Sequence, residues 1–294
     1  MILRWAKSCF VVLVLTLGDG SSGKALAYDT AVDLELVLAI DVSFSIGIDE
    51  QDVQRLAYIT AFRSPRIAAA MTSGANGQIA VTYVEWGDSG FQRVVIPWRL
   101  ISSRADAAMF AEDLEKAPIR RSGATSISAA LEFSAALFRN NGFHANRQLI
   151  DISGDGLNSE GPPVDATRAK LNTLGITVNA LPLASKDSDL TPKDLTAYYD
   201  ACVATGPGSF TLPAASTQDF AIAMQRKMIA EIASGIPEAV PRGPEAKIWN
   251  ASLATVDCLM GERQRREDYL DMLRDLTNGR PERWQPDRKT WPVP

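Results

Sequence analysis

Residues 34–45 read LELVLAIDVSFS: a nearly continuous apolar run, Leu34–Ile40, leads directly into an aspartate and two serines. Such a run is typical of a strand that is buried on both faces of a parallel sheet. In an extended or gently turned loop, residues two apart point the same way, so Asp41, Ser43 and Ser45 can face one point. The stretch therefore predicts a buried strand with a cluster of oxygen atoms at its carboxyl end.

Strand patterns and long helical patterns alternate from this stretch to residue 235. The expected strands are Leu34–Ile40, Gln78–Trp86, Arg93–Trp98, Arg147–Ile152, Ile176–Leu183 and Ser209–Leu212. The expected helices are Asp49–Phe62, Ala105–Lys116, Ser126–Phe138, Val164–Leu174, Leu190–Cys202 and Thr217–Ala233. The short turn Gly87–Gly90 implies that the second and third strands form an antiparallel hairpin. This order predicts an α/β fold: a doubly wound, mostly parallel, Rossmann-like sheet with one antiparallel edge strand and helices on both faces.

The first 27 residues have the pattern of a secretory signal peptide. Arg4 and Lys7 precede the apolar run Phe10–Leu17, and a small-residue cleavage pattern ends at Ala27. The run is far shorter than the ~20 residues that a membrane span needs. We therefore expect cleavage after Ala27 and a periplasmic or secreted chain with no membrane span. An uncleaved N-terminal anchor is the alternative.

Two further segments follow the leader. Residues 28–235 form the expected α/β domain, and residues 236–294 form a Pro-rich linker and a helical tail. The tail contains one helical pattern, Glu262–Leu276, and a Pro-rich end that carries Trp284 and Trp291. These tryptophans either pack back on the domain, which we favour, or belong to a surface for a partner.

Composition excludes several classes of function. The chain has 30 basic and 35 acidic residues and a net charge of −5, which falls to −7 when residues 1–27 are removed. A chain this acidic is a poor candidate for nucleic-acid binding. The single histidine, His144, excludes a multi-histidine zinc site, and its loop-like surroundings predict a surface or loop-packing residue.

Removal of the leader leaves two of the three cysteines, Cys202 and Cys258. Pairing is allowed in an oxidising compartment. A disulfide that ties the tail to the domain is the favoured expectation, and two buried thiols are the alternative.

Three polar motifs follow strands or precede a helix at one expected edge of the sheet. They supply Asp41, Ser43 and Ser45, then Thr125 in GAT, then Asp155 after the Arg147–Ile152 strand. Each motif alone is typical of caps and turns. Together they make an all-oxygen set, which suits a hard cation such as Mg²⁺, with Mn²⁺ or Ca²⁺ as alternatives.

The motifs DVSFS at 41–45, SGATS around Thr125 and SGDG around Asp155 resemble the metal-ion-dependent adhesion site of the von Willebrand factor A-type domain. The resemblance covers about residues 32–235. The stretches VTYVEWG, IPW and GPGSF are similar to a bacterial secreted branch of that family.

The resemblance implies roles for the five candidate residues. Ser43, Ser45 and Thr125 would bind the metal directly, and Asp41 and Asp155 would bind it mostly through water. The family leaves one coordination position for an acidic group of a partner protein. Phe44 departs from the family pattern, in which a small residue is common there, and it would narrow access or form an apolar wall for the ligand.

Three function classes follow from these observations. The leading one is a periplasmic or secreted, metal-dependent protein-binding module that is not an enzyme. Ser43 stands where a D-x-D phosphoryl-transfer motif after the first strand would have its second acid, and the sequence has no G-x-S-x-G or P-loop pattern. A metal-assisted hydrolase with Glu85 or Asp155 as base is the second class, and a structural domain with an empty site is the third.

Overall fold

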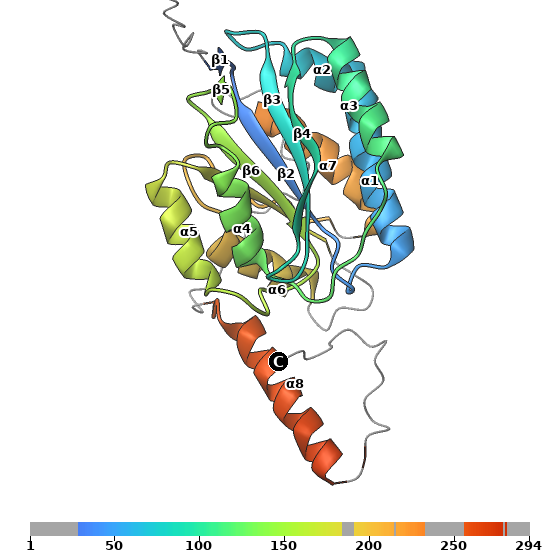
Figure 1. Ribbon diagram of the computed structural model, residues 1–294, viewed down its shortest axis with the longest axis vertical. Coiled ribbons are helices and arrows are strands. Elements are labelled where there is room, and N and C mark those ends of the chain that lie inside the picture. Colours follow the sequence, from blue (N-terminus) through green and yellow to red (C-terminus); the bar gives the residue numbers. More distant parts are fainter. Residues whose placement is uncertain (1–28, 184–190, 215, 233–255, 279, 281–294) are drawn as a thin grey trace, which may run out of the picture.

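The computed structural model describes residues 29–183, 191–214, 216–232, 256–278 and 280. Five strands form its central sheet, in the order β4-β3-β2-β6-β7 (Figure 1). Their bounds are β2 Glu35–Asp41, β3 Ile79–Trp86, β4 Gln92–Ile101, β6 Gln148–Gly154 and β7 Thr177–Pro182. All neighbouring pairs are parallel except β3 and β4, which are antiparallel. The expected α/β fold with one antiparallel edge strand is confirmed.

Strand β2 lies at the centre of the sheet, and each of its seven residues is buried. Its side chains alternate between two apolar layers, as the two-residue period of a strand requires. Leu36, Leu38 and Ile40 belong to one layer, and Val37 and Ala39 belong to the other. This explains why the strand reads as an almost continuous apolar run rather than as alternating residues.

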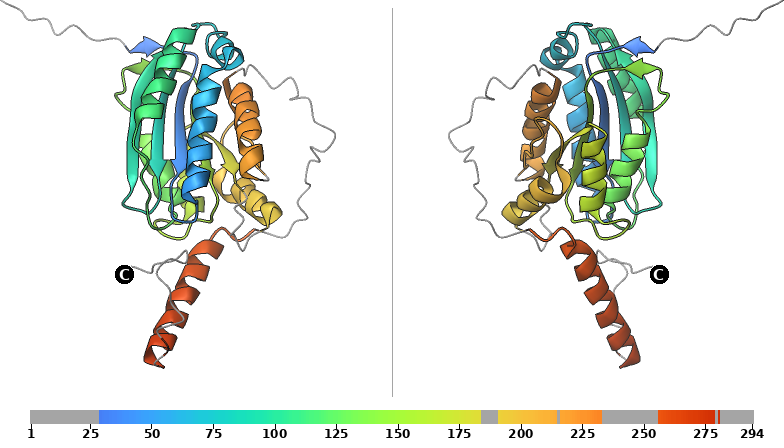
Figure 2. Two further views of the ribbon diagram at one scale, coloured as in Figure 1. Left: turned by 90° about the vertical axis from the view of Figure 1, so that its right-hand side faces the viewer. Right: turned by 90° about the vertical axis from the view of Figure 1, so that its left-hand side faces the viewer.

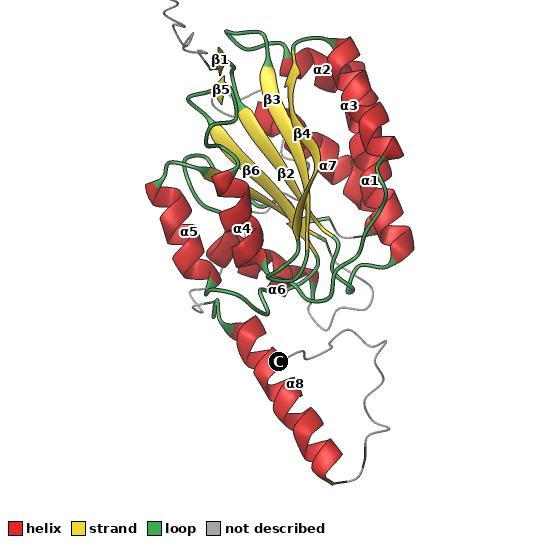
Figure 3. Cartoon of the chain, in the orientation of Figure 1, coloured by secondary structure: helices red, strands yellow, loops and turns green. Residues whose placement is uncertain are grey.

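Helices cover both faces of the sheet (Figures 1 and 3). One layer contains α1 Ile48–Arg63, α2 Pro65–Met71, α3 Arg104–Lys116 and α7 Thr217–Ile232. The other contains α4 Ile127–Ala136, α5 Val164–Thr173, α6 Pro192–Tyr198 and a π-helical turn, η1 Tyr199–Val203. The carboxyl ends of the parallel strands lie at one edge of the sheet, between these two layers.

Several expected elements differ from the structure. The helix expected at Leu190–Cys202 is α6 followed by η1, and α6 begins at Pro192, a residue favoured in the first turn of a helix. The strand expected at Ser209–Leu212 makes only isolated bridges, among them Ala180 with Thr211. Prolines and glycines flank that segment in the sequence, which limits regular pairing.

Three short elements were not expected from the sequence. They are α2 and a parallel pair of two-residue strands, β1 Thr30–Ala31 and β5 Phe143–His144. His144 is exposed in β5, in agreement with the expectation of a surface residue. Two-residue strands carry too short a pattern to be recognised along the chain, because their pairing is decided by residues far apart in sequence.

Helix α8, Met260–Thr277, extends away from the carboxyl edge of the sheet (Figures 1 and 2). A disulfide between Cys202 in η1 and Cys258 ties its start to the domain, with the two Cα atoms 5.5 Å apart. The expected bond is therefore present. The leader, the linker and the tryptophans Trp284 and Trp291 lie outside the described residues.

Within the described part of the chain, no helix has both the length and the apolar character needed to cross a bilayer.

A buried ion cluster joins α1 to the β3–β4 hairpin. Glu85 is 1% exposed and pairs with Arg55 of α1 and with Arg93 of β4, whose Nη2 lies 2.8 Å from Glu85 Oε2. The buried Glu85 carboxylate thus has two cationic partners, of which Arg55 is buried and Arg93 is partly exposed. Removal of the central carboxylate would leave the buried Arg55 without its charge partner.

We predict that Cys258→Ser lowers the free energy of unfolding by about 2–4 kcal/mol, because the unfolded chain gains freedom that the disulfide removes. Urea denaturation under non-reducing conditions measures this change. Wild-type protein in reductant is the matched control and should lose the same amount. Equal midpoints for all three samples would contradict a stabilising bond.

We predict that Glu85→Ala lowers the free energy of unfolding by about 3–5 kcal/mol, because it leaves a buried arginine uncompensated. Glu115→Ala is the matched control, since Glu115 makes an exposed pair with Arg63. Exposed pairs contribute little, so this control should unfold almost as the wild type does. Similar denaturation curves for the two variants would show that the cluster is not important for stability.

Candidate functional site

Three loops meet at the carboxyl edge of the sheet. Residues 42–47 follow β2, residues 117–126 join α3 to α4, and residues 155–163 follow β6. In doubly wound folds, ligands bind outside this edge. The five candidate ligands lie in these loops or, as Asp41 does, at the end of β2.

Hydrogen bonds fix the first two loops to each other. Ser122 N donates to Val42 O at 3.0 Å, and Phe44 N donates to Gly123 O at 3.4 Å. Arg121 adds a second link, because its Nη2 donates to Phe44 O at 3.0 Å and to Ile46 O at 2.8 Å. The serine loop is therefore held in one conformation by a segment about 80 residues further along the chain.

Hydrogen bonds connect four of the candidate residues one after another. Ser43 N donates to Asp41 Oδ1 at 2.7 Å, which fixes the turn after β2. The Ser43 and Ser45 hydroxyl oxygens lie 2.9 Å apart. Ser45 Oγ in turn donates to Asp155 Oδ1 at 2.6 Å. The structure thus brings Asp155 to the serines from a strand that lies 110 residues away.

Thr125, the fifth candidate, lies against the loop that carries Asp155. A Cβ atom placed on Gly156 would be 3.4 Å from Thr125 Oγ1. Ser159 fixes this arrangement, since its backbone N and its Oγ both donate to Thr125 O, at 2.9 and 3.0 Å. Thr125 is 8% exposed, so its hydroxyl is largely shielded from solvent.

Asp41 lies in a dry and electrostatically unfavourable position. Burial raises the pKa of its carboxyl well above the usual range, and repulsion from Asp155 raises it further, against hydrogen bonds from Ser43. Asp41 Oδ2, Tyr199 Oη and Trp86 Nε1 are buried, and none has a hydrogen-bond partner among the described residues. Burial, followed by the charges of Asp41 and Asp155, also raises the Tyr199 pKa.

Gly154 allows this close approach. A Cβ atom there would lie 2.6 Å from Tyr199 Oη and 2.9 Å from Asp41 Oδ2, so any larger residue would displace one of them. The end of β6 is thus shaped around the buried Asp41 carboxylate.

These residues fit a hard divalent cation. Two carboxylates and three hydroxyls supply only oxygen, and a positive ion would offset the repulsion between Asp41 and Asp155. The described residues contain no group of three or more acidic, histidine or cysteine side chains placed to hold a metal ion. A cation here would therefore depend on hydroxyl groups and water as well as on the carboxylates.

Glu85, considered from the sequence as a base beside this site, lies on the opposite face of the sheet. It is in register with Ile40, whereas Asp41 is in register with Trp86. Its two carboxylate oxygens contact Arg55 and Arg93. The prediction that Glu85 lies at a strand end is correct, but its side chain is on the face of the sheet opposite to that of Asp41. The Asp187-Ser188-Asp189 motif lies outside the described residues.

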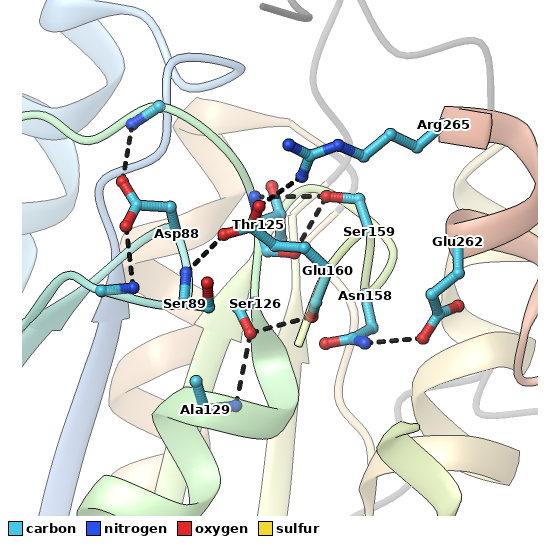
Figure 4. A network of polar contacts seen from close by, with 12 residues as sticks. Asp88, Ser89, Thr125, Ser126, Ala129, Asn158, Ser159, Glu160, Glu262 and Arg265 are labelled. Atoms are coloured by element: carbon cyan, nitrogen blue, oxygen red, sulfur yellow. Dashed lines mark hydrogen bonds and ion pairs between the residues drawn. The ribbon is translucent and has the colours of Figure 1, made fainter. Parts of the chain in front are cut away.

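Sequence reasoning missed the network that braces the rim (Figure 4). Asp88 follows β3 and accepts hydrogen bonds from Ser122 Oγ and from Gly90 N, the latter at 2.9 Å. Glu160 accepts a hydrogen bond from Ser89 N. Asp88 could have been found from the sequence, because it follows an expected strand of the same sheet at the edge where the site was predicted.

The same rim contacts α8 (Figure 4). Arg265 Nη1 lies 2.5 Å from Glu160 Oε2, and Asn158 Nδ2 donates to Glu262 Oε1 at 2.7 Å. Gly261 packs directly on this loop, since a Cβ atom there would be 2.2 Å from Asn158 O. Thus the tail helix begins beside the loop that carries Asp155.

Comparison with solved structures supports the fold. Proximal thread matrix protein 1 from the mussel byssus, in a structure with a zinc-occupied MIDAS motif, is 16% identical with a TM-score of 0.52. That match covers 70% of this chain and 49% of the mussel chain. The pilus adhesin SpaC from Lactobacillus rhamnosus GG is 12% identical with a TM-score of 0.50, covering 70% of this chain and 32% of SpaC.

A von Willebrand factor type A structure from Catenulispora acidiphila is 17% identical with a TM-score of 0.44, covering 69% of this chain and 43% of that one. The chain thus spans about half or less of the length of these proteins. A search among curated proteins finds no match. The fold is of the von Willebrand factor A type. Residues 31–236 match the model of the family DUF1194, which is described as proteins of unknown function, and the chain therefore belongs to DUF1194.

Proposed function

We propose that this protein is an exported protein-binding module in which a divalent cation bridges the carboxyl edge of the sheet to an acidic group of a partner. The observation that carries the proposal is the hydrogen-bonded chain from Asp41 through Ser43 and Ser45 to Asp155. It links hydroxyl and carboxylate oxygens to Asp41, whose buried Oδ2 has no hydrogen-bond partner among the described residues.

Mg²⁺ is the cation that this set of atoms suits best. Mg²⁺ binds few carboxylates and keeps several water molecules, which matches a site with two carboxylates and three hydroxyls. Ser43, Ser45 and Thr125 would hold it directly, and Asp41 and Asp155 would hold it through water. Mn²⁺ and Ca²⁺ also take oxygen ligands. The structure of the mussel protein with a zinc-occupied MIDAS motif supports a divalent cation in a protein of similar fold.

An exposed aromatic ring beside the site favours a protein partner. Phe44 lies between Ser43 and Ser45 and is 53% exposed. The Arg121 guanidinium lies 5.0 Å from the centre of its ring, so the ring is held by a cation–π contact. A partner carboxylate that reaches the cation would lie beside this ring, and the ring offers apolar contact to the residue that bears the carboxylate.

Export is supported by the leader pattern of residues 1–27 and by the disulfide between Cys202 and Cys258. Disulfides persist in oxidising compartments such as the periplasm and the extracellular space. The name of SpaC as a pilus adhesin is consistent with a binding role outside the cytoplasm.

The hydrolase alternative receives no specific support from the geometry. Glu85, one of its two candidate bases, is bound to Arg55 and Arg93 on the other face of the sheet. Calorimetric titration with Mg²⁺ distinguishes the proposed function from the alternative of a structural domain without a cation.

We predict that Mg²⁺ produces a saturable heat on calorimetric titration of the wild type, and that Ser43→Ala weakens its affinity by about 10-fold or more. Ser73→Ala is the matched control, since Ser73 is exposed before β3, at the amino end of the strands. It should bind as the wild type does. No heat with Mg²⁺, Mn²⁺ or Ca²⁺ would refute the cation site.

We predict that Phe44→Ala binds Mg²⁺ normally but captures the partner about tenfold more weakly, because the apolar contact is lost while the cation ligands remain. An affinity pull-down with and without EDTA measures this. Wild type should lose its partner in EDTA, and Ser43→Ala should lose it in both conditions. Capture that is insensitive to EDTA and to both substitutions would show that this edge is not the binding surface.

A further inference from the structure

A second charged cluster lies in the apolar layer beneath α7, away from the rim. Lys227 of α7 and Asp151 of β6 are both 0% exposed, and Glu231, one turn after Lys227, is 1% exposed. Lys227 Nζ contacts both Asp151 Oδ1 and Glu231 Oε1. Fully buried lysine is rare in proteins, and it needs an explanation beyond surface charge.

The surroundings of the amine are mainly apolar. The Phe210 ring centre lies 5.9 Å from Lys227 Nζ, and neighbouring residues of α7, Met224 and Met228, are buried in the same layer. Neither oxygen of Asp151 has a hydrogen bond with a described residue, although Oδ1 touches the amine. The carboxyl of Asp151 is therefore held against Lys227 in a dry environment without the hydrogen bonds that usually stabilise a buried carboxylate.

Glu231 is fixed by its other neighbours. Asn179 Nδ2 donates to Glu231 Oε1 at 3.0 Å, and Phe210 N holds Asn179 by donating to its Oδ1 at 3.0 Å. Burial, together with repulsion from Asp151, raises the pKa of Glu231 to about 8, against the opposing effects of Lys227 and Asn179. Glu231 thus keeps its proton near neutral pH and is available as a proton donor.

An interior of this kind favours uncharged groups. Two carboxyls and one amine in a dry layer carry a large desolvation cost as ions, and conversion of the amine and one carboxyl into an amide removes that cost for both groups. Lys227 Nζ and the Asp151 carboxyl are already in contact. These are the two reactants of amide formation, and the fold holds them together.

We propose that Lys227 and Asp151 form an intramolecular isopeptide bond, and that Glu231 transfers the protons. Lys227 passes one proton to Asp151 Oδ1, and its neutral Nζ then attacks Asp151 Cγ and forms the C–N bond. Glu231 delivers its proton to the leaving hydroxyl, so the C–O bond breaks and one water molecule leaves, and Glu231 then takes a proton from the nitrogen that has been acylated. Glu231 returns to its starting state, and no oxidant or reductant is needed.

The fold supplies what this step requires. A desolvated lysine is an activated nucleophile. Fixed proximity replaces a bimolecular encounter, which gives effective concentrations of about 10⁵ M or more in well-oriented systems. The excluded water also protects the product from hydrolysis. The bond would tie α7 covalently to the central sheet.

The mass of the denatured, disulfide-reduced wild-type chain tests the proposal. We expect it to be lower, by one water molecule, than the mass calculated for the sequence from its observed N-terminus. A tryptic digest should contain one branched peptide that joins Asp151 to Lys227, with no cleavage after Lys227. Two separate linear peptides and the full calculated mass would overturn the proposal.

Matched variants assign the roles. Lys227→Arg keeps the charge but should show the full calculated mass, and Glu231→Gln should retain unreacted Lys227 and Asp151. Lys170→Arg is the control, since Lys170 is on the surface and pairs with Glu132, and it should lose water as the wild type does. The wild-type mass decides the proposal even if a variant fails to fold. Loss of ammonia in place of water, mapped to Asn179, would overturn Asp151 as the acyl group.

Discussion

The burial of β2 on both faces is the constraint on which the rest of the structure depends. A strand without a solvent face needs helices on both sides, and α1, α3 and α7 on one face and α4 and α5 on the other satisfy this need. The two layers leave only the ends of the strand open. Asp41 is the last residue of β2 and is followed directly by a loop, yet it is 0% exposed. The chemistry of the edge follows from a carboxylate placed where water is scarce.

The protein compensates buried charge in three different ways. Glu85 is neutralised by two arginines and contributes to the structure. Asp41 and Asp155 lie close enough to repel each other, and a cation with hydroxyl ligands offsets this repulsion in the function that we propose. The cluster of Lys227, Asp151 and Glu231 has one amine for two carboxyls, and in our proposal an amide bond removes the charges of Lys227 and Asp151. The ratio of cations to carboxylates distinguishes the three sites.

The rim of the candidate site is held by contacts between segments that are distant in sequence. Arg121 fixes the serine loop, and Ser159 fixes Thr125. Helix α8 joins this network through Arg265 and Glu262, and the disulfide between Cys202 and Cys258 holds its start in place. A protein partner that binds at this edge would thus meet a surface formed by both the domain and its tail.

The sequence by itself determined the α/β fold, because apolar runs and helical periods record which faces of each element are buried. It also placed Asp41, Ser43 and Ser45 together, because alternation in an extended segment is a local property. Asp155 and Thr125 were predicted from motifs at strand and helix ends, which the order of the elements brings to one edge.

Only the tertiary structure decided which face of the sheet Glu85 occupies, that α6 changes into a π-helical turn, and that Arg121, Ser159 and α8 brace the rim. It also decided the environment of Lys227 and Glu231. Spaced four residues apart on a helix, they have the pattern of an ordinary surface ion pair. Their burial depends on the packing of α7 against β6 and β7, and no local pattern records it, because the partner Asp151 lies 76 residues earlier in the chain.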